Sequence, residues 1–133
     1  MSYINNPTSI LAGTGIVVTP TTGTGANTIT ISSSGLASYA IRIATATPVT
    51  VDPDTDDVIS VQVPGPVPVT VDLPAGVTGA TFTIKDGLGL ASIADPITIV
   101  PDSGDIDGAV EAVISAPYGA LTLIYDGVQW WII

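Results

Sequence analysis

Carboxylates are the only chemically active side chains that gather in this sequence. The stretch DPDTDD (residues 52–57) contains Asp52, Asp54, Asp56 and Asp57, and carboxylate oxygens are ligands that Ca²⁺ takes in proteins. An EF-hand loop requires Gly at its sixth place and Glu at its twelfth, whereas counting from Asp52 puts Asp57 and Val63 there. That motif therefore fails. Two interpretations stay open: an irregular loop that gathers some of these four carboxylates around a cation, and an Asp/Pro turn whose side chains cap their own backbone.

Nucleophilic catalysis has little support in this chain. It needs a base beside the nucleophile, usually histidine, and the sequence has neither histidine nor cysteine. The one lysine, Lys85 in TIKDG, is better explained as a strand-edge cation near Asp86 than as a catalytic amine. A glycosidase pair of carboxylates is not indicated, because the one glutamate, Glu111, lies within an expected strand and twelve acids approach one another by chance. The second acidic stretch, PDSGDIDG (residues 101–108), is predicted to be mainly a turn. We expect no enzyme activity and no cofactor.

The net charge of the chain restricts its partners. Twelve acidic residues face two cations, Arg42 and Lys85, which gives a net charge of −10. Such a surface cannot neutralise phosphates and is repelled by nucleic acid and by an anionic membrane leaflet, so neither is expected as a partner. The start, MSYINNPTSI, has no basic and apolar segments of a signal peptide, and the apolar runs fall short of a membrane span. Synthesis in a cytoplasm is expected.

The elements that position these side chains are predicted to be β-strands. Apolar residues make up 46% of the chain but aromatic residues only 5%. The 14 Gly and 11 Pro residues indicate frequent turns between strands. Apolar and polar residues alternate with the strand period in about ten segments, spaced as in a β-sandwich or β-prism. We expect an all-β protein. The segments are residues 15–19, 28–32, 39–45, 57–63, 67–73, 81–85, 97–100, 110–115, 121–125 and 128–133.

Two turn signals sharpen this prediction. Pro68 lies inside the segment VPVTVDL (residues 67–73), and a proline cannot donate to a ladder, so that segment is predicted to be an edge or bulged strand. Asp126-Gly127 stands between two good strand segments and predicts a two-residue hairpin turn.

The first 38 residues differ in composition from the rest of the chain. They are rich in Gly, Thr and Ser, and no charged side chain precedes Arg42. One interpretation is a flexible linker. The β-prone residues in this stretch favour the other interpretation, an extended arm or hairpin (residues 1–38) that precedes a main domain of residues 39–133. These β-prone residues are Ile16, Val17, Val18, Ile29 and Ile31.

The closing segment WWII (residues 130–133) places large apolar residues where a chain normally meets water. Trp130 and Trp131 are neighbours on an expected strand, so their side chains face opposite sides. One indole could stack on a sugar ring, or both could pack, one inside the subunit and one against a partner. The continuing apolar run favours packing. We expect Trp130, Trp131, Ile132 and Ile133 to form a contact between identical subunits.

Five stretches in a fixed order carry a family resemblance. They are TVDPDTDDVISV, VTVDLPAG, TFTIKDGLGLAS, DPITIVPDSGDIDG and YGALTLIYDGVQWWII. From about residue 47 onward this order resembles a β module of tailed-phage virion proteins, found in tail fibres, head fibres and related appendages. The stretch LAGTGIVVT…GANTITIS also looks like the short Gly-Thr hairpin repeats of phage fibre and tail proteins. The resemblance covers about two-thirds of the chain.

What the resemblance implies is a non-enzymatic, homotrimeric appendage on the virion surface. A short module with an arm suits a capsid decoration (cement) protein or head spike. The alternative is a receptor- or glycan-binding tip of a tail fibre or baseplate, with Tyr118, Tyr125 or a tryptophan as the stacking surface. The expected partners are other copies of the chain, the major capsid protein or another virion protein, and in the alternative a host surface glycan. Residues 16–18, 29 and 31 of the arm are the expected attachment residues.

Overall fold

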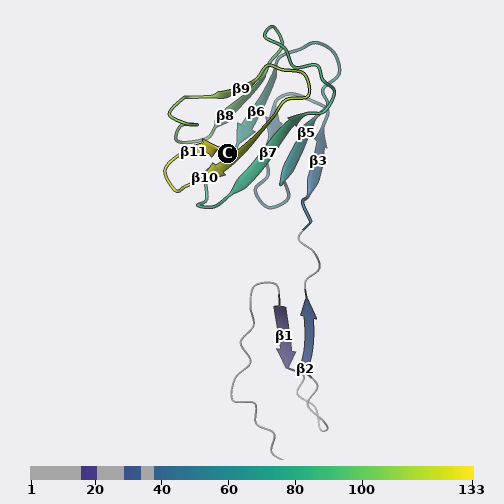
Figure 1. The fold of residues 1–133 in the computed structure, drawn as a ribbon, viewed down its shortest axis with the longest axis vertical. Coiled ribbons are helices and arrows are strands. Elements are labelled where there is room, and N and C mark those ends of the chain that lie inside the picture. The colour runs from purple at the N-terminus through teal and green to yellow at the C-terminus, as the bar shows by residue number, and fades with distance from the viewer. Residues whose placement is uncertain (1–15, 21–28, 34–37) are drawn as a thin grey trace, which may run out of the picture. The chain divides into compact units, whose positions relative to one another are not determined.

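The computed structural model describes residues 16–20, 29–33 and 38–133, with side chains from residue 38 onward. The chain divides into two compact units, Met1–Ser38 and Tyr39–Ile133. In the first unit, β1 (Ile16–Pro20) and β2 (Ile29–Ser33) form an antiparallel pair (Figure 1) in which Val18 lies opposite Ile31. The side chains of this pair, including the expected attachment residues, lie outside the described residues.

The second unit confirms the all-β prediction. Residues 38–133 form nine strands in two sheets and no helix. The five-stranded sheet has the order β11 (Trp130–Ile132), β10 (Ala120–Tyr125), β7 (Thr81–Asp86), β5 (Val58–Val61), β3 (Ile41–Ala44). The four-stranded sheet has the order β4 (Val49–Thr50), β6 (Val69–Leu73), β8 (Ile97–Pro101), β9 (Ala112–Ile114).

The chain crosses from one sheet to the other at almost every connection. From β3 to β8 consecutive strands lie in alternate sheets, and within each sheet the neighbours β3-β5-β7 and β4-β6-β8 run parallel. Parallel neighbours require a crossover, which here is a strand of the opposite sheet in place of a helix. The result is a flattened coil of three turns, β3-β4, β5-β6 and β7-β8. The antiparallel strands β9, β10 and β11 complete the two sheets beyond the third turn.

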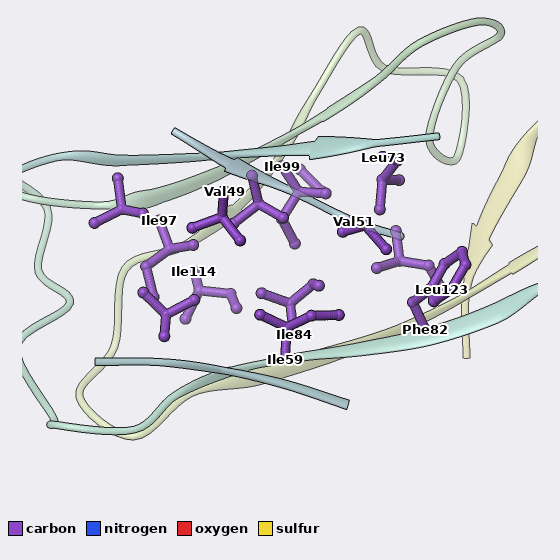
Figure 2. Close-up of a cluster of buried hydrophobic side chains, with 14 of the residues drawn as sticks. Val49, Val51, Ile59, Leu73, Phe82, Ile84, Ile97, Ile99, Ile114 and Leu123 are labelled. Carbon is purple, nitrogen blue, oxygen red and sulfur yellow. The ribbon is translucent and has the colours of Figure 1, made fainter. Parts of the chain in front are cut away.

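The core lies between the two sheets, as Figure 2 shows. Residues of the same kind occupy the same register position in successive turns: Val49, Val71 and Ile99 in one sheet, and Ile59 and Ile84 in the other. Val49 and Ile99 face Ile59 and Ile84 across the core (Figure 2). The burial pattern of β6 alternates along the whole strand, as a period of two residues requires. Close packing of Val and Ile between two layers therefore holds the coil together.

The strand segments expected from alternation coincide with the strands apart from one or two residues at their ends, but two details were wrong. The short strand β4 carries no alternation long enough to detect. Pro68 does not weaken its strand, because β6 begins at Val69 and lies inside its sheet, hydrogen-bonded to β4 and β8. The proline stands just before the first ladder position, where the lack of an N–H does no harm.

The two-residue Asp-Gly turn occurs at a different place from the one predicted. Asp107 and Gly108 have φ values of 49° and 78°, and Ile106 and Ala109 exchange two backbone hydrogen bonds of 2.7 and 2.8 Å around them. Positive φ at both central residues is the geometry that favours Asp-Gly in tight hairpins. The predicted hairpin of β10 and β11 exists. Asp126 N–H donates to the Gln129 carbonyl, so the two central residues of its turn are Gly127 and Val128 in place of Asp126 and Gly127.

Candidate functional site

The acidic stretch of residues 52–57 is arranged as a turn. Asp56 is buried and accepts two hydrogen bonds from Arg42, with Nε–Oδ1 2.8 Å and Nη2–Oδ2 2.7 Å. Its Oδ2 also accepts the Asp52 N–H, Asp52 Oδ1 accepts the Asp54 N–H, and Asp57 Oδ2 accepts the Ala40 N–H. This geometry fits the interpretation as a turn that caps its own backbone. Within residues 38–133 no three carboxylates group in a way that could hold a metal ion.

Arg42 closes the open end of the coil. Its register position corresponds to Ile59 and Ile84 in the next two turns, so its side chain points between the sheets. Besides Asp56, its Nη2 reaches the Thr50 carbonyl of β4 at 2.8 Å and thus joins the free edges of both sheets. Burial alone would raise the pKa of Asp56, but the hydrogen bonds from Arg42 and the Asp52 N–H hold that pKa below its usual value.

A second buried carboxylate, Asp86, organises the loop after β7. Its oxygens accept the N–H groups of Leu88, Gly89, Ala91 and Tyr118 at 2.9–3.2 Å. Burial would raise the pKa of Asp86, but these hydrogen bonds together hold it below its usual value. The sequence analysis did not single out Asp86. The signal that could have identified it is the segment GLGLA that follows, because the backbone N–H groups of such a loop need acceptors and a preceding aspartate can supply them.

Lys85 forms a hydrogen bond with a neighbouring turn. Its ammonium donates to the Tyr118 carbonyl and lies 5.9 Å from the centre of the Tyr118 ring. It is a strand cation, as expected, although its partner is a tyrosine rather than Asp86. Tyr118 leaves 62% of its surface exposed, whereas Tyr125 packs against Trp130 with ring centres 5.2 Å apart. Tyr125 is therefore not the stacking surface for a glycan that was considered.

The closing segment divides between the core and the surface. Trp130 is completely buried in its own chain and also contacts Phe82, 5.8 Å between ring centres. Its assignment to a subunit interface was wrong, because alternation turns this side of β11 towards the core. Trp131 faces the opposite side, is 42% exposed and donates its indole N–H to Asp126 Oδ2 at 2.7 Å. Ile132 and Ile133 remain 38% and 71% exposed.

The outward face of the five-stranded sheet is almost free of charge. Alternation directs eleven strand residues to this face, and Lys85 is the one charged residue among them. Its centre is hydroxyl-rich, with Thr83 Oγ1 and Thr122 Oγ1 3.0 Å apart. The eleven are Ile41, Ile43, Val58, Ser60, Thr81, Thr83, Lys85, Ala120, Thr122, Ile124 and Trp131.

Exposed apolar side chains gather at the two edges of this face. At one edge, Tyr39, Ile41 and Ile43 are 59–78% exposed, and we call them the β3-edge cluster. At the other, Trp131 and Ile133 lie on this face, and Ile132, on the opposite side of β11, is partly exposed at the same sheet edge; we call these three residues the β11-edge cluster. Between them lies a depression of about 460 Å³ lined by Tyr39, Asp57, Val58, Thr81, Thr83 and Thr122. This face is the candidate site for interaction.

Comparison with known proteins does not assign the chain to a family. No protein-family model matches the sequence, and no curated protein matches it either. Among the residues that the structure describes, no helix is long and apolar enough to cross a membrane.

Proposed function

We propose that this protein is a non-enzymatic structural protein on the surface of a tailed-phage particle, where it forms a trimer that decorates the head. The observation that carries the proposal is the outer face of the five-stranded sheet, where Lys85 is the one charged strand residue and large apolar residues lie at both edges. In a chain of net charge −10, a face without strand carboxylates is where copies can approach without acid–acid repulsion. The strand and turn order that resembles phage appendages supports the viral context.

The energies favour such an association. The exposed parts of Ile41, Trp131 and Ile133 and their neighbours amount to several hundred Å² of apolar surface. At ~25 cal/mol per Å² their burial contributes on the order of 5–10 kcal/mol before the costs of ordering. A pair of exposed acidic groups at physiological salt opposes association by at most about 1 kcal/mol. Apolar burial therefore outweighs the repulsion between acidic groups.

The use of the polar side chains supports a structural role. Asp56 and Asp86, the buried acids, accept hydrogen bonds from Arg42 and from backbone N–H groups, and Lys85 is bound to a carbonyl. Each of these groups maintains local structure, whereas catalysis would require the group to be free to exchange protons with a substrate. The arm with β1 and β2 is the proposed attachment element, as a compact unit separate from the sheets.

Electron microscopy of particles with and without the gene for this protein tests the proposal directly. We expect density of three-fold symmetry on the head that disappears with the gene and returns when purified full-length protein is added. A variant without residues 1–34 should stay a soluble trimer and fail to bind the particles. Density at the tail tip in place of the head, or no density on the virion, would contradict head decoration.

Glycan recognition is the second candidate, and one observation favours it. Tyr39 lines the central depression together with Thr81, Thr83 and Thr122, and a depression lined by an aromatic ring and hydroxyl groups suits a sugar. A glycan array probed with the trimer distinguishes the two candidates. Binding that is lost in Tyr39→Ala would support recognition, whereas silence together with binding to heads lacking the protein would support decoration.

A further inference from the structure

We infer that the subunits meet edge to edge in a closed ring, with the β3-edge cluster of one copy packed against the β11-edge cluster of the next. This inference rests on the proposed self-association and names the surfaces that produce it. It follows from the placement of the clusters, from their different backbone edges and from the charges beside them.

The two clusters are too far apart to share one contact at a sheet edge. They lie at opposite edges of the sheet order β11-β10-β7-β5-β3, four strand spacings or about 19 Å apart. A two-fold contact centred on either cluster leaves the other exposed in both copies. A head-to-tail contact covers one cluster of each kind, and closing the ring covers all of them.

The two edges also differ in their backbones. Val58 N–H donates to the Ala40 carbonyl at 3.0 Å and Gln62 N–H to the Ala44 carbonyl at 2.7 Å, so the even-numbered residues of β3 face β5. In a parallel pair the alternate residues, Ile41 and Ile43, then direct their N–H and C=O groups away from the sheet. The β3 edge therefore offers unpaired backbone as well as apolar side chains.

The β11 edge has its backbone already paired. Trp130 N–H donates to the Asp105 carbonyl at 2.8 Å, and its carbonyl accepts the Asp107 N–H at 2.9 Å. Ile132 N–H donates to Asp107 Oδ1 at 3.2 Å. This edge therefore contributes side chains alone, and the indole N–H of Trp131 is already satisfied by Asp126, which leaves its carbon surface for packing. The two edges are unlike surfaces, as a head-to-tail contact requires.

Charge disfavours the main alternative, in which β3 pairs with β3 of a second copy. The acidic turn of residues 52–57 is bound to this strand, since Asp57 accepts the Ala40 N–H at 2.7 Å. A β3–β3 contact would bring two such turns together, each with four aspartates. Pairing with the β11 edge brings one such turn near Asp107 and Asp126 instead of near a second turn, and both of these carboxylates accept backbone N–H hydrogen bonds, Asp107 from Ile132 and Asp126 from Val128 and Gln129.

The size of the two clusters sets the strength of one contact. Their six side chains, two of them aromatic and together roughly half exposed, offer on the order of 700 Å² per subunit. A head-to-tail contact pairs one cluster of each kind, so these side chains supply on the order of 700 Å² in total from the two partners, against roughly 1,600 Å² for a standard interface. The β3 backbone and the rim add to each contact, and a closed ring gives each subunit two contacts, so ring closure stabilises the assembly beyond a single contact.

The test compares three full-length variants by sedimentation velocity at micromolar concentration. Ile43→Asp disrupts the β3 edge, Trp131→Asp disrupts the β11 edge, and Ile93→Asp is the control, because Ile93 is 92% exposed in the loop between β7 and β8. Wild type and the control should sediment as trimers. Each edge variant should dissociate at least tenfold more readily and run mainly as monomer. Circular dichroism verifies folding, and Ile133→Asp replaces Trp131→Asp if the latter unfolds.

Mixing the two edge variants is the decisive measurement. Each retains one intact cluster, so an equal mixture should form a 1:1 pair of twice the chain mass that cannot close into a ring. A mixture that stays monomeric indicates a two-fold contact and overturns the inference. Edge variants that remain trimeric also overturn it while leaving the proposed trimer intact. A monomeric wild type would overturn both the ring and the trimeric function.

Discussion

Arg42 and Asp56, fourteen positions apart, are joined by two hydrogen bonds of 2.8 and 2.7 Å at the open end of the coil. The aspartate side chain is 1% exposed and the arginine side chain 38% exposed, so the pair shields the core from solvent between β3 and β4. An inward-pointing charge on an edge strand is also a device against uncontrolled strand addition. The same pair thus stabilises the fold and limits what the β3 edge accepts.

Removing the cation of this pair should destabilise the fold. Arg42→Met keeps the aliphatic stem but leaves the Asp56 carboxylate buried without its partner, so we expect a loss of about 3 kcal/mol in the free energy of unfolding. Urea unfolding at pH 7 measures it. Lys85→Met removes the same charge from the solvent-facing side of the sheet, where no carboxylate is left buried without its partner, and should cost less than about 1 kcal/mol. Equal losses in the two variants would show that the Arg42–Asp56 pair has no special role.

Acid should unfold the protein through its buried carboxylates. The pKa values of Asp56 and Asp86 are lowered in the fold, so their contribution to stability is complete above their unfolded value of about 4 and is lost as pH falls through the folded values. Stability measured from pH 7 to pH 2 should decrease below about pH 4.

Asp86→Asn gives that titration a specific test. The amide offers one oxygen acceptor in place of two and turns its NH2 group towards one pair of N–H donors, either Leu88 and Gly89 or Ala91 and Tyr118, so the variant should lose about 2 kcal/mol at pH 7. Its stability should also depend less on pH between 4 and 2. Asp102→Asn, in the exposed loop after β8, is the matched control. An unchanged acid slope in Asp86→Asn would refute this role for the carboxylate.

The two adjacent tryptophans should behave in opposite ways. In an Ile43→Asp background, which separates folding from assembly, Trp130→Ala should lose about 3–5 kcal/mol because it empties the core beside Phe82. Trp131→Ala should lose less than about 1 kcal/mol there. Acrylamide quenching of the single-tryptophan variants Trp131→Phe and Trp130→Phe, in the same Ile43→Asp background, provides a second measurement. Trp130 should be protected and Trp131 accessible; equal quenching would contradict the burial.

A side chain at Gly89 should destabilise the loop after β7. Its φ is +72°, and an added Cβ would lie within the ring atoms of Tyr118, so Gly89→Ala combines backbone strain with a steric clash. Gly65 also has a positive φ, +89°, but open space around it, so Gly65→Ala measures the backbone cost alone, about 1 kcal/mol. Gly89→Ala should exceed that value by at least ~1 kcal/mol in thermal or urea unfolding. Tyr118→Ala should recover the difference, and its failure to do so would contradict the contact.

Local patterns determined the strands, and they did so for a physical reason. Alternation of apolar and polar residues is a property of neighbouring positions, so segments such as TFTIK identify their own strand and its two faces without reference to the rest of the chain. The same holds for Asp-Gly turns as a class. It fails for β4, where the two residues Val49–Thr50 are too short to alternate and owe their strand geometry to pairing with β6.

The tertiary structure decided which strands pair and which face each strand buries. Alternation placed Trp130 and Trp131 on opposite sides, but only the contacts with Phe82 and Tyr125 turn Trp130 inward. Likewise the acidic stretch left both a cation loop and a turn open until Arg42, fourteen residues away, paired with Asp56. These outcomes depend on segments distant in sequence being brought together by the coil of parallel strands, and no property of a single segment encodes that closure.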